Sequence, residues 1–228
     1  VRGGYKPAHT LVFCAMAAEE WGIIDSKYDW STGAYNQVFR VHPDWQGKVI
    51  ADLNFELPAH AHNTQDAIRC TYEYADFIRQ FTDSLTVPKE AYPDGITVLS
   101  PIETWSDDFS MAIAGIPSTV NDFSAGPFMQ NYYHSQYDNQ DVYQEAVYQF
   151  HHECYLKLIM AIDRLVLPPM NFSNTMNAVT ESIRENALSF AEPEQNILIR
   201  NLQTITASAE NIYEKICRIN AEYATLSD

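Results

Sequence analysis

Basic residues are scarce in this chain. Lys and Arg together number 14 among 228 residues, against 30 Asp and Glu, and the formal net charge is −16. Binding to nucleic acid depends on clustered cations that neutralise phosphates, so no nucleic-acid partner is expected. The same acidic excess argues against docking on an anionic membrane. Bound divalent cations, by contrast, would offset part of the repulsion between the carboxylates.

Long apolar runs and paired cysteines are also missing from the sequence. No stretch reaches the roughly 20 apolar residues of a membrane-spanning helix, and no signal peptide is recognisable. The four cysteines are widely separated and include no Cys-x-x-Cys pair, which argues against a thiolate zinc site and a dense disulfide framework. Cys14, Cys154 and Cys217 lie in apolar or helical patterns and are predicted to be buried thiols. The chain opens at Val1, and we expect a processed product or a part of something longer.

Strands and helices alternate in the first part of the chain. Apolar runs predict strands at 10–17, 46–55, 96–99 and 118–120. Helical spacing of apolar residues predicts helices at 25–40, 63–85 and 106–114, and residues 121–139 form a loop. Such alternation is typical of an α/β fold, with a mixed, largely parallel sheet covered by helices.

The remainder of the chain is predicted to be helical. Three amphipathic helices are expected at 144–167, 173–190 and 194–223, the first ended by Pro168-Pro169. We therefore predict two domains, an α/β domain over 1–167 and a helical appendage over 168–228. Asn171-Phe172-Ser173 matches the N-glycosylation acceptor pattern, a triplet that is also frequent by chance.

Two adjacent carboxylates, Glu19 and Glu20, directly follow the first apolar run, and Trp21-Gly22 come next. One interpretation is the acidic start of a helix, which the helix macrodipole favours. The other interpretation is a hydrolytic metal site. There, one carboxylate binds the metal while its neighbour acts as general base toward water.

Two further metal-competent side chains are predicted near strand ends or in loops. Asp52 ends the predicted strand 46–55, and His134 lies in the loop 121–139. In open α/β sheets, functional residues gather beyond the carboxyl ends of the strands. Carboxylates together with one imidazole form a donor set that zinc accepts. Each residue also has a structural interpretation, Asp52 as a turn residue or helix cap and His134 as a hydrogen-bonded loop histidine.

In combination, these segments resemble the co-catalytic zinc peptidases that include bacterial aminopeptidases, glutamate carboxypeptidase II and the transferrin receptor. The segment from Glu19 to Gly22 resembles the family's Glu-Glu-x-Gly, and Asp52 falls on the Asp of its Asn-x-Asp strand end. Tyr133-His134-Ser-x-Tyr-Asp138 resembles its Tyr-His-(Ser/Thr)-x-Tyr-Asp segment.

Two further segments extend the resemblance over nearly the whole chain. Ser106-Asp-Asp-Phe109 with Gly115-Ile-Pro117 resembles the family's Ser-Asp-His-x-x-Phe and Gly-Ile-Pro segment beside the substrate cleft. Leu165-Val-Leu-Pro168 and the helices after it resemble the dimerisation region of the carboxypeptidase and receptor branch. The resemblance therefore implies a peptidase-like domain followed by a dimerisation-like region.

The resemblance assigns a role to each candidate residue. It implies that Glu19 is the general base, that Tyr133 stabilises the tetrahedral intermediate, and that Glu20, Asp52 and His134 bind zinc. It further implies a site for two zinc ions, a peptide substrate, a homodimer, and a location outside the cell or in its envelope.

Two departures from the family pattern narrow these expectations. A His and a bridging Asp that complete the family's metal site lie upstream of the Glu-Glu segment, so this chain is expected to hold only part of the site. His9 does not match that motif. His60 and His62 are interpreted as exposed loop histidines or, alternatively, as metal ligands.

The second departure concerns specificity. Val120 and Asp122 stand where glutamate carboxypeptidases carry arginines, and Asp107 stands where they carry Asn. An aminopeptidase or general exopeptidase is therefore predicted rather than a glutamate-directed carboxypeptidase. The alternative is a non-catalytic, transferrin-receptor-like binding or assembly domain.

Overall fold

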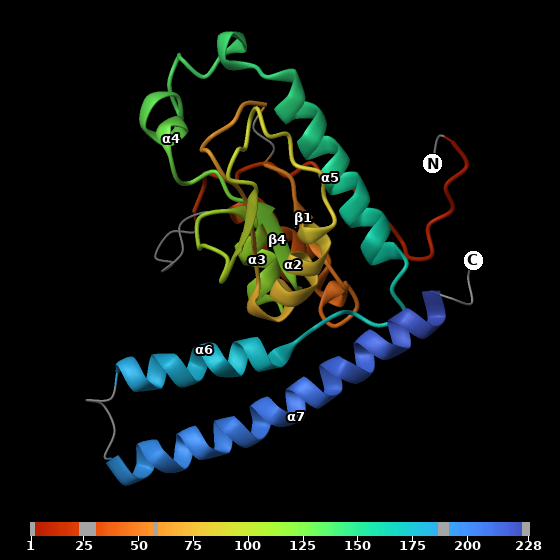
Figure 1. Cartoon of the computed structure of the whole chain (residues 1–228), viewed down its shortest axis with the longest axis vertical. Coiled ribbons are helices and arrows are strands. Elements are labelled where there is room, and N and C mark those ends of the chain that lie inside the picture. Colours follow the sequence, from red (N-terminus) through yellow and green to blue (C-terminus); the bar gives the residue numbers. More distant parts are fainter. Residues whose placement is uncertain (1–2, 23–30, 57–58, 187–191, 225–228) are drawn as a thin grey trace. The chain divides into compact units, whose positions relative to one another are not determined.

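The structure is a computed structural model that describes residues 3–22, 31–56, 59–186 and 192–224 (Figure 1). The described residues form one sheet of four strands. The strands are β1 (Asp52–Asn54), β2 (Asp66–Cys70), β3 (Ile96–Leu99) and β4 (Ser118–Asn121). Their order is β1-β4-β2-β3, with β1–β4 and β2–β3 parallel and β2–β4 antiparallel. The predicted α/β class with a mixed, largely parallel sheet is confirmed.

Two of the predicted strands, 96–99 and 118–120, are confirmed as β3 and β4. The predicted strand 46–55 is reduced to β1, and Asp52 begins this strand rather than ending it. The helix predicted over 63–85 is wrong at its start, because Asp66–Cys70 form β2, while Ala75–Asp83 are helical. A short buried strand has no alternating pattern, so periodicity alone does not separate it from a helix.

The predicted buried strand at 10–17 is wrong. Residues 10–17 have no strand structure, and the side chains of Val12 and Phe13 are 59% and 78% exposed. Cys14, predicted to be buried, is also exposed. A strand requires a neighbour that completes its backbone hydrogen bonds, and in the described part of the chain the sheet does not extend to this segment.

Five α-helices of the described residues precede residue 164 in the sequence. They are α1 (Thr32–Asn36), which continues as a π-helical turn (Gln37–Val41), α2 (Ala75–Asp83), α3 (Asp107–Ile113), α4 (Pro127–Asn131) and α5 (Glu145–Asp163). Single 3-10 turns occur at Pro43–Trp45, Tyr72–Tyr74 and Gln140–Val142. The helix predicted at 25–40 is confirmed from Thr32 onward, and residues 25–30 lie outside the described residues. Helix α4 interrupts the predicted loop 121–139.

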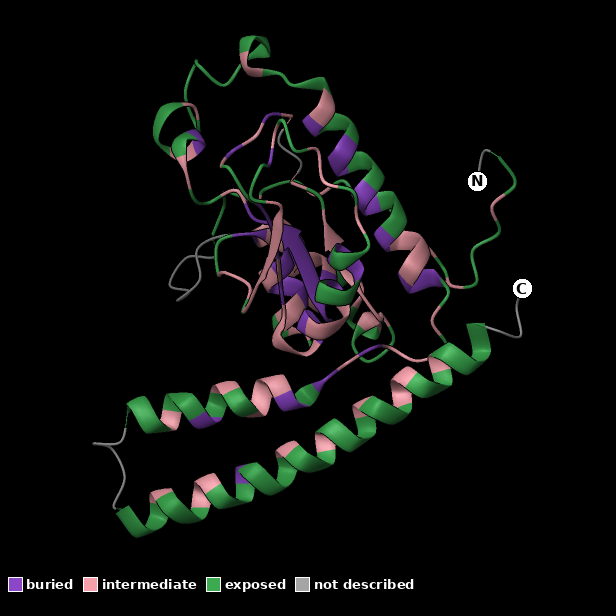
Figure 2. Ribbon diagram, in the orientation of Figure 1, coloured by how far each residue is buried: buried purple, intermediate pink, exposed green. Residues whose placement is uncertain are grey.

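Helix α5 buries one stripe of side chains, visible as the purple face in Figure 2. The buried apolar residues of this stripe recur every three or four positions and are Val147, Phe150, Cys154, Leu158 and Ile162. Val147 and Phe150 form a core cluster with Tyr92. A second cluster consists of Ala34 of α1, Val38 of the π-helical turn, Met111 of α3, and Ile116 just after α3. Cys154 is buried as predicted.

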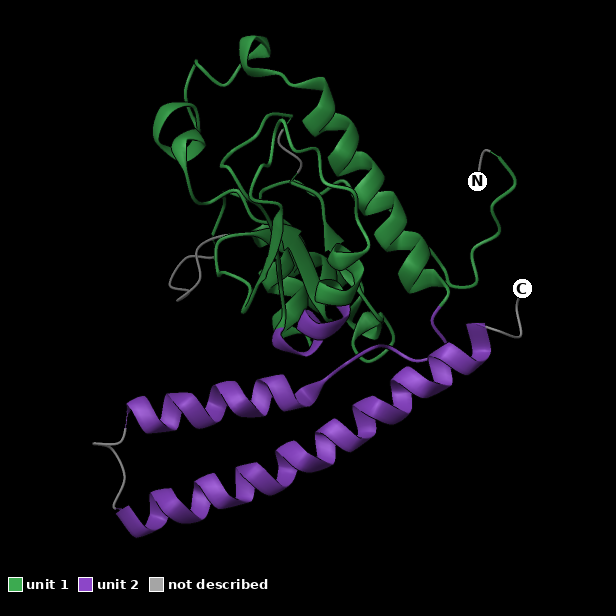
Figure 3. Ribbon diagram, in the orientation of Figure 1, with its two compact units in different colours: residues 1–71, 78–164 green, residues 72–77, 165–228 purple. Residues whose placement is uncertain are grey.

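The chain divides into two compact units (Figure 3). Unit 1 comprises residues 1–71 and 78–164, and unit 2 comprises residues 72–77 and 165–228. The candidate site residues all belong to unit 1. The domain division at 167/168 stays a prediction about the family's domains.

Unit 2 is built around a hairpin of two helices, α6 (Phe172–Glu185) and α7 (Glu192–Ala224). Asn171 caps α6, because its Oδ1 accepts hydrogen bonds from Ser173 N (3.0 Å) and Ser173 Oγ. Its Nδ2 donates to Asp76 Oδ2 at 2.6 Å, and the residue is only 6% exposed. The Asn171 side chain is therefore committed to structure. None of the described helices combines the length and apolar character that a membrane span requires.

Candidate active site

Glu20 and His134 meet although 114 positions separate them (134 − 20). His134 Nε2 lies 3.0 Å from Glu20 Oε1, and both side chains are more than half exposed. His134 adopts a φ of +53°, a left-handed conformation that few non-glycine residues take. Its imidazole stacks on the ring of Tyr133, with centroids 3.9 Å apart. The turn thus presents Tyr133 and His134 together beside the glutamate pair.

Asp52 is half-buried and places its carboxyl group at the start of β1. Its Oδ2 is buried and has no hydrogen-bond partner among the described residues. Burial raises the pKa of Asp52 to about 7, the Asp108 carboxylate adds to the rise, and a hydrogen bond from Ser118 opposes it. A buried, unpartnered carboxylate oxygen is costly unless a proton or a cation joins it.

Glu19 lies in a cluster of acidic side chains that repel one another. Burial raises the pKa of Glu19 to about 7, and the neighbouring carboxylates of Glu56, Asp107, Glu20 and Asp108 add to the rise. The pKa values of Asp107 and Asp108 are each raised to about 6, again first by burial. Asp107 Oδ1 and Asp108 Oδ2 are buried, and neither has a hydrogen-bond partner in the part of the chain that the structure describes. The folded chain therefore concentrates negative charge that a cation would relieve.

Asn54, at the end of β1, holds two of these carboxylates in place. Its Nδ2 lies 2.9 Å from Glu56 Oε1, 2.9 Å from Ser106 Oγ and 3.3 Å from Asp108 Oδ1. Ser106, the residue before α3, also donates its hydroxyl to Glu56. One amide group thus ties the end of β1 to the start of α3 and orients Glu56 and Asp108.

Two adjoining cavities lie at these residues. The larger, of about 570 Å³, is lined by His134, and the smaller, of about 70 Å³, is lined by Glu19 and Asp108. Glu56, Phe123 and Tyr133 line both cavities. Tyr133 therefore stands at their junction, beside the acidic cluster.

Arg69 is a cation in the wall of the smaller cavity, and its guanidinium is already engaged. It lies 2.7 Å from Asp122 Oδ2 and 3.3 Å from Glu103 Oε1, and it donates to Pro101 O at 2.9 Å. Burial alone would raise the pKa of Asp122, but hydrogen bonds from Ser124 and Arg69 hold it below its usual value. Arg69 is therefore neutralised by its own neighbours.

This geometry agrees with what a comparison with known families finds. The sequence model of peptidase family M28 matches residues 1–159. The chain belongs to peptidase family M28. No curated protein matches the sequence.

Among solved structures, the M28 chain is similar to the LapA aminopeptidase of Legionella pneumophila, with a TM-score of 0.42 and 14% sequence identity. The matched region covers 60% of this chain and 37% of that aminopeptidase. The chain therefore spans well under half the length of this aminopeptidase.

The fit of the M28 chain to a zinc ion is partial. Two ligands of one tetrahedral zinc, each about 2 Å from the ion, lie about 3.3 Å apart, close to the 3.0 Å between His134 and Glu20. The unpartnered Asp52 Oδ2 is also suited to a cation. However, the described residues contain no group of three or more His, Cys, Asp or Glu side chains that could hold a metal ion. Two predicted ligands are brought together, and the described side chains alone do not complete the set.

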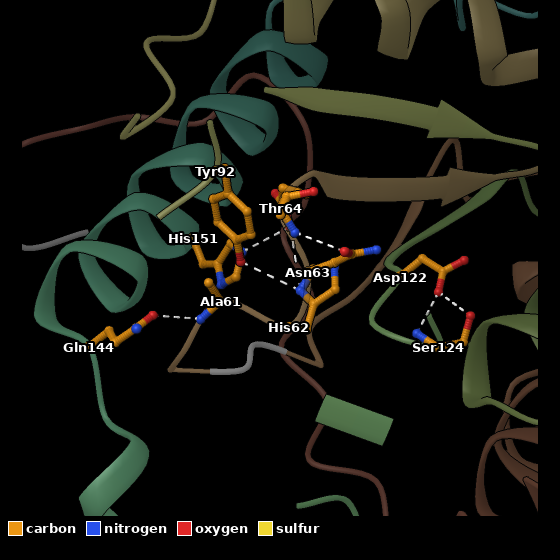
Figure 4. A network of polar contacts seen from close by, with 10 residues as sticks. Ala61, His62, Asn63, Thr64, Tyr92, Asp122, Ser124, Gln144 and His151 are labelled. Atoms are coloured by element: carbon orange, nitrogen blue, oxygen red, sulfur yellow. Dashed lines mark hydrogen bonds and ion pairs between the residues drawn. The ribbon is translucent and has the colours of Figure 1, made fainter. Parts of the chain in front are cut away.

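The predicted exposure of His60 and His62 is wrong. His60 and His62 are buried, with exposures of 8% and 3%, and not exposed loop residues. His62 Nδ1 lies 3.5 Å from Tyr92 OH, which in turn lies 3.3 Å from His151 Nε2 (Figure 4). His151 Nε2 lies 3.3 Å from Asp66 Oδ1. A polar contact with Tyr92 holds His62 inside the fold, and ring contacts with Phe128 and Tyr132 hold His60 there. The polarity of the two side chains alone did not predict this burial.

His9 is engaged in structure, as its mismatch with the family motif suggested. Its backbone N–H donates to Asp163 Oδ1 at 2.8 Å, and Asp163 also accepts hydrogen bonds from Tyr5 OH and Ala8 N. The end of α5 thereby anchors residues 5–9.

Sequence reasoning missed Glu56 and Asp108 as members of the site. Asp108 lies within the segment Ser106–Phe109, which carried part of the family resemblance. That motif could therefore have indicated Asp108 as a site residue. Glu56 follows β1 by two residues, as expected for a group at a strand's carboxyl end. No motif singled it out.

Proposed function

We propose that this chain carries part of the site of a zinc-dependent exopeptidase of the aminopeptidase type. Membership of peptidase family M28 supports peptide-bond hydrolysis. The observation that carries the zinc part of the proposal is the contact between Glu20 and His134, with Glu19 and Tyr133 directly beside them. Glu20 and His134 would bind one zinc, and Asp52 would bind the second. The ligands that complete both sites would come from an upstream segment of the protein.

Glu19 is suited to the role of general base. A base works best when its pKa lies near the working pH, and burial together with acidic neighbours raises the pKa of Glu19 to about 7. Glu19 lines the smaller cavity and would take a proton from the attacking water and pass it to the leaving amine. Bound zinc would supply positive charge that polarises the scissile carbonyl and favours ionisation of water.

Tyr133 is suited to donate a hydrogen bond to the developing oxyanion. Burial and the nearby Glu19 carboxylate raise the pKa of the Tyr133 phenol, so the hydroxyl keeps its proton at neutral pH. The residue lines both cavities and therefore borders any substrate that bridges them. A donor fixed in this position would stabilise the transition state more than the substrate.

The charge of the smaller cavity favours an aminopeptidase over a carboxypeptidase. Its lining includes the carboxylates of Glu19, Glu56 and Asp108, and its Arg69 is neutralised by Asp122 and Glu103. A substrate's α-ammonium group would be attracted here, whereas a terminal carboxylate would be repelled.

The test compares Glu19→Gln with the wild type, both made with the natural upstream segment. We expect the substitution to abolish hydrolysis of aminoacyl p-nitroanilides and to leave the bound zinc unchanged in metal analysis. Glu153→Gln, on an exposed face of α5, is the matched control and should retain activity. Loss of zinc in Glu19→Gln, or retained turnover, would overturn the assigned role.

A non-catalytic binding or assembly domain is the second candidate. The observation in its favour is the lack of a three-ligand group among the described side chains. Zinc titration of the protein with its upstream segment separates the two candidates. Stoichiometric zinc binding supports the peptidase, whereas binding of no zinc supports the assembly role.

We also propose that the hairpin α6–α7 mediates homodimerisation. Ile205, Ile212 and Ile219 recur every seven residues along α7 and are 50%, 57% and 40% exposed. Heptad spacing of exposed β-branched residues is typical of a helix that packs against another helix. Sedimentation of the double variant Ile205→Ser, Ile212→Ser should show monomers. Thr204→Ser, Asn211→Ser is the control, and a wild type that remains monomeric at high micromolar concentration would refute the proposal.

A further inference from the structure

The larger cavity has walls of a distinct chemistry. Four of its twelve described lining residues carry an aromatic six-membered ring, Phe123, Phe128, Tyr133 and Tyr143, and none of the twelve is Lys or Arg. The polar lining includes two carboxylates, of Glu56 and Asp138, and two imidazoles, of His60 and His134. Such walls suit a large aromatic group and disfavour one that carries a negative charge.

His60 is the unusual member of this lining. The residue is 8% exposed, and its Nε2 is buried with no hydrogen-bond partner among the described residues. Its ring contacts Phe128 and Tyr132, with centroids 4.4 Å and 6.2 Å apart. Burial lowers the pKa of the imidazole, so at neutral pH the ring is neutral and can donate or accept a hydrogen bond. A buried nitrogen without a partner calls for one from elsewhere.

The position of His60 is fixed on both sides in the chain. Gln144 N donates to Ala59 O at 2.7 Å, and Ala61 N donates to Gln144 Oε1 at 2.7 Å (Figure 4). Gln144, which directly precedes α5, therefore holds the backbone immediately before and after His60. The next histidine, His62, is anchored in the buried network with Tyr92.

Helix α4 is held against the same segment. A Cβ added at Gly126, which directly precedes α4, would lie 2.6 Å from His62 O, so the close approach depends on the missing side chain. This approach brings Phe128 onto the His60 ring. Imidazole and aromatic wall are thus built as one unit.

We infer that the larger cavity is a specificity pocket for a tyrosine-like side chain of the peptide substrate, and that His60 hydrogen-bonds its phenolic hydroxyl. The inference rests on the proposed peptidase function. The aromatic walls would contact the ring, and the unpartnered His60 nitrogen would receive or supply the hydrogen bond. A site that expects a hydroxyl discriminates against the analogue without it, because its own buried polar group then stays unpaired.

The test measures binding of L-tyrosinamide and L-phenylalaninamide to the chain by titration calorimetry. Neither ligand carries a carboxylate, and they differ by one hydroxyl. We expect wild type to bind tyrosinamide about five- to tenfold more tightly, the usual effect of one hydrogen bond. His60→Phe should bring the two affinities to within about twofold by removing that bond. His60→Gln, which keeps a polar group, should retain part of the preference.

The control is His152→Phe, an exposed histidine on α5 whose replacement should leave the preference intact. Thermal unfolding of each variant checks that it is folded. Equal binding of both amides by wild type, a preference retained in His60→Phe, or binding of neither amide would overturn the inference.

Hydrolysis is measured separately, so that the two proposals fail separately. If the protein binds tyrosinamide but shows no zinc-dependent hydrolysis of aminoacyl p-nitroanilides, the peptidase proposal is refuted. Binding of tyrosinamide to the pocket is then still supported. Hydrolysis without a preference for tyrosine would refute the pocket alone.

Discussion

Glu19, Asp52, Asp107 and Asp108 have pKa values of about 6 to 7 in the folded chain. In the unfolded chain such carboxyl groups titrate near pH 4. Between about pH 4 and pH 7 the folded state therefore holds more protons, and these groups lower the stability as the pH rises through that window. His60 and His62 act in the opposite direction, because burial lowers their pKa values. A matched variant is needed to isolate the carboxyl effect.

We predict a difference between Asp108→Asn and the wild type when the pH is raised from 5 to 8. The free energy of unfolding of Asp108→Asn should fall less, or rise more, than that of the wild type. The substitution keeps an acceptor for the amide of Asn54 and removes one carboxyl group that resists ionisation. Urea unfolding at both pH values, without divalent cations, measures the difference. An identical pH dependence in the two proteins would contradict this account of the cluster.

Both the backbone conformation and the close packing at Gly126 require a residue without a side chain. Its φ of +100° lies in a region reserved for glycine, and an added Cβ would collide with His62 O. We predict that Gly126→Ala destabilises the chain by about 1–3 kcal/mol. Gly47→Ala is the control, because Gly47 also has positive φ but has open space around it. Urea midpoints should fall further for Gly126→Ala, and an equal fall would refute the close approach.

At the scale of elements, the cap of α6 is the clearest case of a residue that sets a boundary. Asn171 accepts two hydrogen bonds from Ser173 and donates one to Asp76. Asn171→Ala should therefore cost about 1–2 kcal/mol of unfolding free energy, as for other lost caps, and reduce helicity. Circular dichroism during urea unfolding measures both, with exposed Asn196→Ala on α7 as the control. Equal effects of the two substitutions would show that the cap is unimportant.

The elements predicted correctly from sequence are those with a strong local signal. Helices α3 and α5 and strands β3 and β4 each show a clear period or a bounded apolar run. Strand β2 was mistaken for helix, because four of its five residues are buried and the run shows no alternation. The apolar run 10–17 was mistaken for a buried strand, because pairing depends on a neighbour that a local pattern does not reveal.

The candidate site was predictable to a similar extent. The motif around Tyr133 and His134 and the pair Glu19-Glu20 were recognisable, and the structure places His134 against Glu20. The participation of Glu56 depends on the polar network around Asn54, which only the folded chain assembles. The burial of His60 depends on Gln144, 84 positions later (144 − 60), and no short-range pattern encodes it.

At the scale of the whole molecule, the exposed apolar segment near Phe13 has consequences for solubility. Val12 and Phe13 are 59% and 78% exposed, and such surface promotes association. We predict that Phe13→Ser reduces concentration-dependent self-association in light scattering without lowering the urea midpoint, since an exposed side chain contributes little to stability. Thr10→Ser is the control. If Phe13→Ser self-associates as strongly as the wild type, this segment is not the surface through which the chains associate.

The hydrogen bond from Ala61 N to Gln144 Oε1 ties the larger cavity to the first turn of α5. When that turn frays, Gln144 moves and the Ala61 amide loses its acceptor. Hydrogen–deuterium exchange at this single amide thus reports how often the wall around His60 opens. A ligand that fills the cavity would slow the exchange there, at a position that it does not itself need to touch.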